Sequence, residues 1–109
     1  MGISKTAQFT KIQNRKAELF KALGHPARIA IIEYLLDKRA CICNDLVGNL
    51  PLSQSTISQH LAALKKVGII KGEIEGSKMC YCIDFKVWEE FNTINQILIK
   101  SYSNKNECC

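Results

Sequence analysis

The segment from Ser53 to Gly68 constrains the fold more than any other part of this sequence. Ser53 is a favoured N-cap residue, and apolar residues then recur at helical spacing. These apolar positions are Ile57, Leu61 and Leu64. Gly68 suits the left-handed position that ends a helix, and Ile69 beyond it is placed to contact Leu64, as in a Schellman motif. The sequence therefore predicts one helix with both of its ends fixed.

Two short alternating runs follow this helix. They span 69–75 and 79–84 and are separated by a Gly-Ser-Lys turn, which predicts a β-hairpin. A short helix is expected just before the capped one, over 44–50, where Pro51 stops it. A helix, a turn, a capped helix and a hairpin in this order predict a winged helix-turn-helix, a mainly α fold with one small β-hairpin.

Further helices are expected on both sides of this unit. Apolar spacing places one long or two short helices over 6–23, and another from 26 to about 38 with Pro26 in its first turn. A last helix is expected from 85 to about 102, where the apolar residues keep the same period.

Length and charge narrow the class of protein. The 109 residues are fewer than the roughly 150 of a typical domain, so we expect one domain over 1–105 and a flexible, cysteine-containing tail at 106–109. A net charge of +5 favours a polyanionic partner such as nucleic acid. Residues 1–10 lack the apolar stretch of a secretory signal, and no apolar run approaches the ~20 residues of a membrane span. We therefore expect a cytoplasmic chain without membrane contact.

The capped helix carries small polar side chains opposite its apolar stripe. Such side chains let a helix approach a major groove closely, because Gln pairs with adenine and Ser contacts a base or a phosphate. The N–H groups at the start of the helix are also suited to bind phosphates. A merely solvated helix is the alternative, which the hairpin and the basic charge disfavour. The candidate DNA-binding residues are Ser53, Gln54, Ser55, Thr56, Ser58, Gln59, His60 and Lys66, with Lys78 at the hairpin tip as either a wing contact or an ordinary turn residue.

Four motifs occur in a fixed order along the chain. They are A-E-L-F-K-A-L-G-H-P-A-R-I-A-I-I-E-Y-L-L at 17–36, C-I-C-N-D-L at 41–46, S-Q-S-T-I-S-Q-H-L-A-A-L-K-K-V-G-I-I at 53–70, and a G-x-K hairpin. Together they resemble the ArsR/SmtB family of metal- and metalloid-responsive repressors, over about residues 17–84. The resemblance implies a homodimer that binds an inverted-repeat operator in double-stranded DNA and releases it when an inducer binds. The first and last helices would form the dimer interface, through Phe9, Ile12, Trp88, Phe91, Ile94 and Leu98.

The resemblance also assigns the sensing site. The family carries a C-x-C at the start of the first helix of its helix-turn-helix, often with a third cysteine two residues later. Cys41 and Cys43 match the first two, but no third thiol follows. Cys108 and Cys109 are the first candidates to complete the site, within one chain or across the dimer. Cys80 and Cys82 share one face of a predicted strand, where plain packing is the favoured interpretation.

Ligand chemistry limits which ions could act as the inducer. Trivalent arsenic and antimony are thiophilic and suit three thiolates, whereas zinc prefers four ligands that include imidazole. The chain has only two histidines, and the last predicted helix has none. We therefore expect As(III) or Sb(III) as inducer and no organic cofactor, with cadmium and lead left open.

The predicted function is repression that ends when such an ion binds cysteine thiolates. Cys43 is expected at or near the N-cap of the helix that supports the recognition helix. Binding there would move the two recognition helices of a dimer away from the ~34–36 Å that separates successive major grooves. The alternative is a thiol-redox-responsive repressor of the same fold. An enzyme is not expected, because the chain has neither a C-x-x-C motif nor a phosphate-binding loop around a cysteine.

Overall fold

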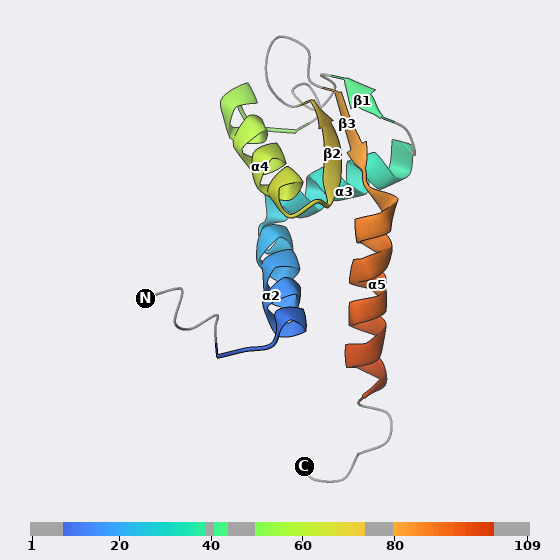
Figure 1. The fold of residues 1–109 in the computed structure, drawn as a ribbon. Coiled ribbons are helices and arrows are strands. Elements are labelled where there is room, and N and C mark those ends of the chain that lie inside the picture. Colours follow the sequence, from blue (N-terminus) through green and yellow to red (C-terminus); the bar gives the residue numbers. More distant parts are fainter. Residues whose placement is uncertain (1–7, 39–40, 44–49, 74–79, 102–109) are drawn as a thin grey trace.

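The computed structural model describes residues 8–38, 41–43, 50–73 and 80–101, with residue 43 described by its backbone alone (Figure 1). The predicted helix over 44–50, the hairpin tip and the tail at 106–109 lie outside these residues, apart from residue 50. None of the described helices is long and apolar enough to span a membrane.

Helix α2, Lys11–Leu23, lies within the 6–23 segment for which one long or two short helices are predicted, and it begins at Lys11. The cause is a capping box at Thr10, whose hydroxyl accepts from the Gln13 backbone N–H at 3.0 Å while the Gln13 side chain accepts from the Thr10 N–H at 3.0 Å. Gln8 and Phe9 therefore precede α2 and are not helical. Helix α3, Pro26–Lys38, begins at the proline as predicted.

Helix α4, Gln54–Lys66, has both predicted ends. The Ser53 hydroxyl accepts from the Thr56 N–H at 3.3 Å, which confirms the N-cap. At the other end, Gly68 takes a φ of 90°. Its N–H donates to the Lys65 carbonyl at 2.9 Å, and the Ile69 N–H donates to the Leu64 carbonyl at 3.1 Å. These two bonds make the predicted Schellman motif.

The predicted hairpin is confirmed and gains a third strand. Strands β2, Ile70–Glu73, and β3, Cys80–Ile83, pair antiparallel. Strand β1, Ile42–Cys43, pairs antiparallel with the other edge of β3, so the sheet order is β1-β3-β2. Cys43 lies in β1, where Ile42, only 7% exposed, enters the core opposite Tyr81 and so favours an extended backbone. The helix predicted over 44–50, at or near whose N-cap Cys43 was expected, lies outside the described residues apart from residue 50.

Helix α3 lies at the centre of the molecule and contacts α2, α4 and β3 (Figure 1). Helix α5, Phe85–Lys100, follows β3 after the N-cap Asp84. Helices α2 and α5 extend from the same side of the body formed by α3, α4 and the sheet (Figure 1). The most deeply buried side chains are Leu19, Ile31, Leu35, Ile57, Leu61, Leu64, Ile69, Ile70 and Tyr81.

Candidate functional site

The recognition helix α4 divides into a buried and an open side, as predicted. Its three apolar residues, Ile57, Leu61 and Leu64, are fully buried. The predicted DNA-binding residues Ser53, Gln54, Ser55, Gln59 and Lys66 are exposed, while Thr56, Ser58 and His60 are half-buried. Lys78 lies outside the described residues. The structure therefore gathers a polar, accessible surface along one helix.

The start of α4 is a cluster of hydroxyl groups. The Ser53 hydroxyl donates to the Thr56 hydroxyl at 3.0 Å and lies 3.2 Å from the Ser55 hydroxyl. Small hydroxyls at an exposed helix N-terminus suit a phosphate oxygen, because the N–H groups and the helix dipole there favour negative charge. Lys65 and Lys66 are exposed in the last turn of the same helix and add positive charge.

His60 joins the recognition helix to α3. Its Nδ1 accepts from the Nε of Arg28 at 3.1 Å, and its ring lies 4.5 Å from the ring of His25. Arg28 also donates from Nη1 to the Ala22 carbonyl at 3.2 Å. Burial lowers the pKa of His60, and the charges of His25 and Arg28 lower it further. Neutral His60 is therefore the form that fits as an acceptor for Arg28.

The cysteines meet on the face of the sheet that points away from the core. Cys41 directly precedes β1, and Cys82 is on β3, where its Cα partner on β2 is Lys71. The Cys41 and Cys82 thiols are free and hydrogen bonded to each other. Burial raises the pKa of the Cys82 thiol, Cys41 raises it further, and Lys71 lowers it. The sequence interpretation paired Cys41 with Cys43 and the tail, and it missed this contact.

The next position along the same two strands also carries cysteines. The Cα of Cys43 lies opposite that of Cys80 in the β1–β3 register, and Cys80 is disulfide-bonded. Tyr81, between Cys80 and Cys82, is buried at 1% exposure, so the two cysteines share the other face as predicted. In the sequence, Cys41 and Cys43 flank Ile42 as Cys80 and Cys82 flank Tyr81, and this shared spacing was a signal for two strands but not for the register that joins them. Cys108 and Cys109 lie outside the described residues.

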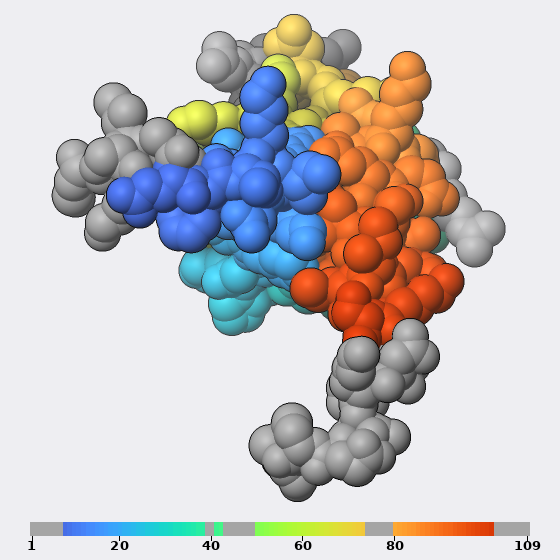
Figure 2. All heavy atoms as spheres, turned by 60° about the horizontal axis from the view of Figure 1, so that its bottom comes forward, coloured from blue at the N-terminus to red at the C-terminus, as the bar shows by residue number. Residues whose placement is uncertain are grey.

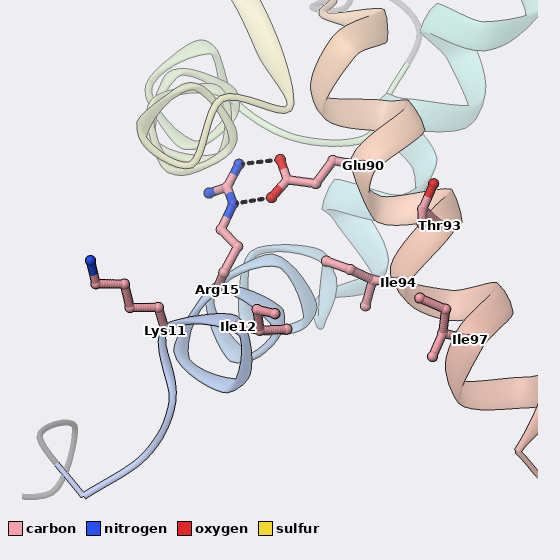
Figure 3. Close-up of a pocket in the computed structure, with 7 residues that line it drawn as sticks. All are labelled: Lys11, Ile12, Arg15, Glu90, Thr93, Ile94 and Ile97. Carbon is pink, nitrogen blue, oxygen red and sulfur yellow. Dashed lines mark hydrogen bonds and ion pairs between the residues drawn. The ribbon is translucent and has the colours of Figure 1, made fainter.

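The residues assigned to a dimer interface lie on α2, α5 and the turn before α2. Phe9, Ile12 and Leu98 are more than half exposed, whereas Trp88, Phe91 and Ile94 are half-buried against the core. Figure 2 shows α2 and α5 in contact when this end of the molecule is viewed. A bidentate ion pair joins the two helices within one chain, from Arg15 Nε and Nη2 to Glu90 at 2.9 and 3.1 Å (Figure 3). The Arg15 guanidinium lowers the pKa of Glu90.

Comparison with known proteins identifies the family. The model of the bacterial regulatory protein arsR family matches residues 25–71, which run from the turn before α3 through α4 into β2. The chain is 36% identical over 85 residues to the HTH-type transcriptional regulator MJ1325 of Methanocaldococcus jannaschii, covering 76% of this chain and 94% of the relative. The chain belongs to the ArsR family.

Two other proteins are similar to this ArsR-family chain. A cadmium resistance transcriptional regulatory protein CadC homolog of Staphylococcus aureus is 32% identical over 92 residues, covering 84% of this chain and 70% of the relative. The solved structure of reduced HlyU from Vibrio cholerae N16961 superposes with a TM-score of 0.61 at 29% identity, covering 86% of this chain and 95% of HlyU. The winged helix-turn-helix fold and the class of transcriptional regulator are thereby confirmed, and the family is not an enzymatic one.

Proposed function

We propose that this ArsR-family regulator is a repressor that binds its operator as a homodimer and dissociates when trivalent arsenic or antimony, or another thiophilic ion, binds thiolates that include Cys41. One observation carries the proposal. The exposed, free thiol of Cys41 is hydrogen bonded to a second free thiol on the sheet that continues into the wing. Two adjacent thiols in a DNA-binding domain suit a ligand that binds sulfur.

The described residues favour a sulfur ligand set over a zinc site. Both histidines are engaged with each other at the α3–α4 junction, where Arg28 donates to His60. Zinc normally takes four ligands, often with imidazole, so this arrangement supports the thiophilic ions instead.

The α2–α5 face supports the homodimer. Ile12 and Ile97 are 65% and 61% exposed and line one hollow together with Ile94 and the Arg15–Glu90 pair (Figure 3). Exposed apolar side chains gathered on one face are typical of a surface that another protein covers. A second copy would bury this face and place two α4 helices on successive major grooves.

A thiol-redox response is the second candidate function. Cys80 is disulfide-bonded while Cys41 and Cys82 are free thiols in contact, so the sheet carries cysteines in both states. The similar structure of HlyU is described as that of its reduced form. Loss of two protons and two electrons from Cys41 and Cys82 to a peroxide would close a disulfide between them.

A fluorescence anisotropy titration of a labelled operator tests both candidates. As(III), Sb(III), Cd(II), Zn(II) and hydrogen peroxide are added in turn to the parent chain, to Cys41→Ser and, as the matched control, to Cys108→Ser/Cys109→Ser. We expect As(III) to release the parent, and Cys41→Ser to keep the operator bound at the same As(III) concentration. Release by peroxide but not by As(III) would overturn the first proposal in favour of the second. Loss of operator binding by ligand-free Cys41→Ser would show a structural cysteine instead.

A further inference from the structure

Two free thiols meet on the face of the sheet that points away from the core, one directly before β1 and one on β3. Ile42, Tyr81 and Ile83 point to the core and are at most 7% exposed. Cys41 is exposed, Cys82 is half-buried, and the two thiols are hydrogen bonded. A ligand from solvent therefore reaches both sulfurs from one side without any rearrangement of the core.

The number of free thiols on this face of the sheet limits which ligands it can bind. Cys41 and Cys82 are the free cysteines among the described residues, and Cys80 is disulfide-bonded. No third His, Cys, Asp or Glu joins them there among those residues. Lys71, the cross-strand neighbour of Cys82, cannot act as a metal ligand while it is charged. A ligand complete with two thiolates fits better than one that needs three or four.

We propose that Cys41 and Cys82 together bind trivalent arsenicals that carry one carbon substituent, RAs(OH)₂. This inference rests on the proposed function and names its ligand and its second binding residue. Two As–O bonds break and two As–S bonds form, and each thiol proton leaves with one hydroxide as water. Arsenic stays trivalent, and the carbon substituent occupies the third position. Inorganic arsenite is expected to bind the same two thiols more weakly, because its arsenic atom keeps a hydroxide as third ligand where a third thiolate would be favoured.

The tail is poorly placed to replace Cys82 within one chain. Helix α5 carries the chain away from the sheet for 16 residues, which is about 24 Å. Only seven steps separate Ser101 from Cys108, and even a fully extended chain covers about 3.3–3.6 Å per residue. The tail would have to be stretched to its full length to return, whereas Cys82 already contacts Cys41.

The position of Cys82 explains how the ligand would act on DNA binding. Two residues later, the Asp84 carboxylate accepts from the Lys86 N–H at 3.1 Å and caps α5. The Asp84 N–H donates to the Ile69 carbonyl at 2.9 Å, directly after the end of α4. An arsenical that joins β1 to β3 therefore acts where the wing, the recognition helix and the proposed dimer helix meet.

The test measures binding of phenylarsine oxide to the full chain without DNA, by calorimetry and by native mass spectrometry. The starting protein is Cys108→Ser/Cys109→Ser, so the vicinal tail thiols do not compete. We expect one arsenical per chain on this protein. Cys41→Ser or Cys82→Ser in the same background weakens binding by about 10²–10⁴-fold, because one thiol loses the effective concentration of the other.

A double-mutant comparison shows whether the two thiols form one site. Cys41→Ser/Cys82→Ser should lose less affinity than the sum of the two single losses, because either single change already breaks the two-thiol site, whereas independent sites would add their losses. An affinity of Cys82→Ser for phenylarsine oxide equal to that of the starting protein overturns the inference. If Cys82→Ser fails to fold, Cys41→Ser provides the same test, because Cys41 is exposed. If the arsenical binds Cys41 and Cys82 but the operator is not released, the site is confirmed and the proposed function is contradicted. If arsenite releases the operator only when Cys108 and Cys109 are present, the proposed function is supported and the Cys41–Cys82 site is contradicted.

Discussion

At the scale of single residues, Gly72 in β2 shows how closely the wing strands approach. Its φ is 125°, and a Cβ there would collide with the Cys80 carbonyl oxygen and lie 2.8 Å from the Tyr81 Cα. We predict that Gly72→Ala lowers the free energy of unfolding by about 1–3 kcal/mol, measured by urea denaturation. Gly24→Ala is the control, because Gly24 has a φ of −83° and its Cβ would come no closer than 3.3 Å to the Phe20 carbonyl oxygen. Equal losses in the two variants would contradict this account.

His60 gives a prediction about pH. Burial holds its pKa below the ordinary value in the folded state, so the unfolded chain binds a proton more readily. The free energy of unfolding is therefore at its full value above about pH 6.5 and falls as the pH drops through the folded-state pKa. We predict that His60→Gln, which keeps an acceptor for Arg28, loses less stability than the parent between pH 7.5 and 5.5. Parallel urea midpoints for the two proteins over this range would count against the role given to His60.

The cysteines show what sequence reasoning reached at this scale and what it missed. The i, i+2 spacing of Cys80 and Cys82 was interpreted as one strand face, and the structure confirms it. The same spacing at Cys41 and Cys43 was interpreted through the family motif alone, and the alternation around buried Ile42, which indicates a strand, was not used. The contact between Cys41 and Cys82 is set by the β1–β3 register, which joins residues about forty positions apart, and local spacing does not encode it.

At the scale of elements, α4 was the best predicted part because its ends depend on local chemistry. Ser53 and Gly68 fix the two termini through bonds to residues at most four positions away. Strand β1 is the opposite case. It has two described residues and no turn of its own with β3, so only the finished sheet defines it.

The exposed side of α4 gives a paired prediction about DNA. Gln59→Ala should weaken operator binding by about 1–3 kcal/mol and leave the salt dependence unchanged, because its amide is suited to pair with a base. Lys66→Ala should instead lower the slope of log K against log salt by about one per recognition helix, since it would lose a phosphate contact. Anisotropy titrations at four salt concentrations separate the two effects. If the slope falls in Gln59→Ala and stays unchanged in Lys66→Ala, the base contact and the phosphate contact are assigned to the wrong residues.

At the scale of the whole molecule, the apolar α2–α5 face is expected to hold two copies together. Ile97→Glu places a charge on this face and should weaken self-association by at least about 2 kcal/mol, roughly thirtyfold, with a parallel loss of operator binding. Gln96→Glu is the matched control, because it adds the same charge one position away on α5. Sedimentation equilibrium measures the association. A parent chain that stays monomeric while it binds the operator would contradict the dimer.

Release of DNA by a ligand at the sheet requires coupling between the thiols and α4. Typical couplings of ~1–3 kcal/mol change affinity about 5–150-fold and act equally in both directions. If arsenite lowers operator affinity, the operator must lower arsenite affinity by the same factor. This reciprocity separates regulation from incidental capture of arsenite by exposed thiols.

The most direct test is therefore calorimetric titration of arsenite into the parent protein, free and saturated with operator DNA. We predict arsenite binding that is at least fivefold weaker in the operator complex, by the same factor that arsenite weakens operator binding. Cys41→Ser should show neither effect. Equal arsenite affinity with and without operator would contradict the claim that binding at Cys41 controls release from DNA.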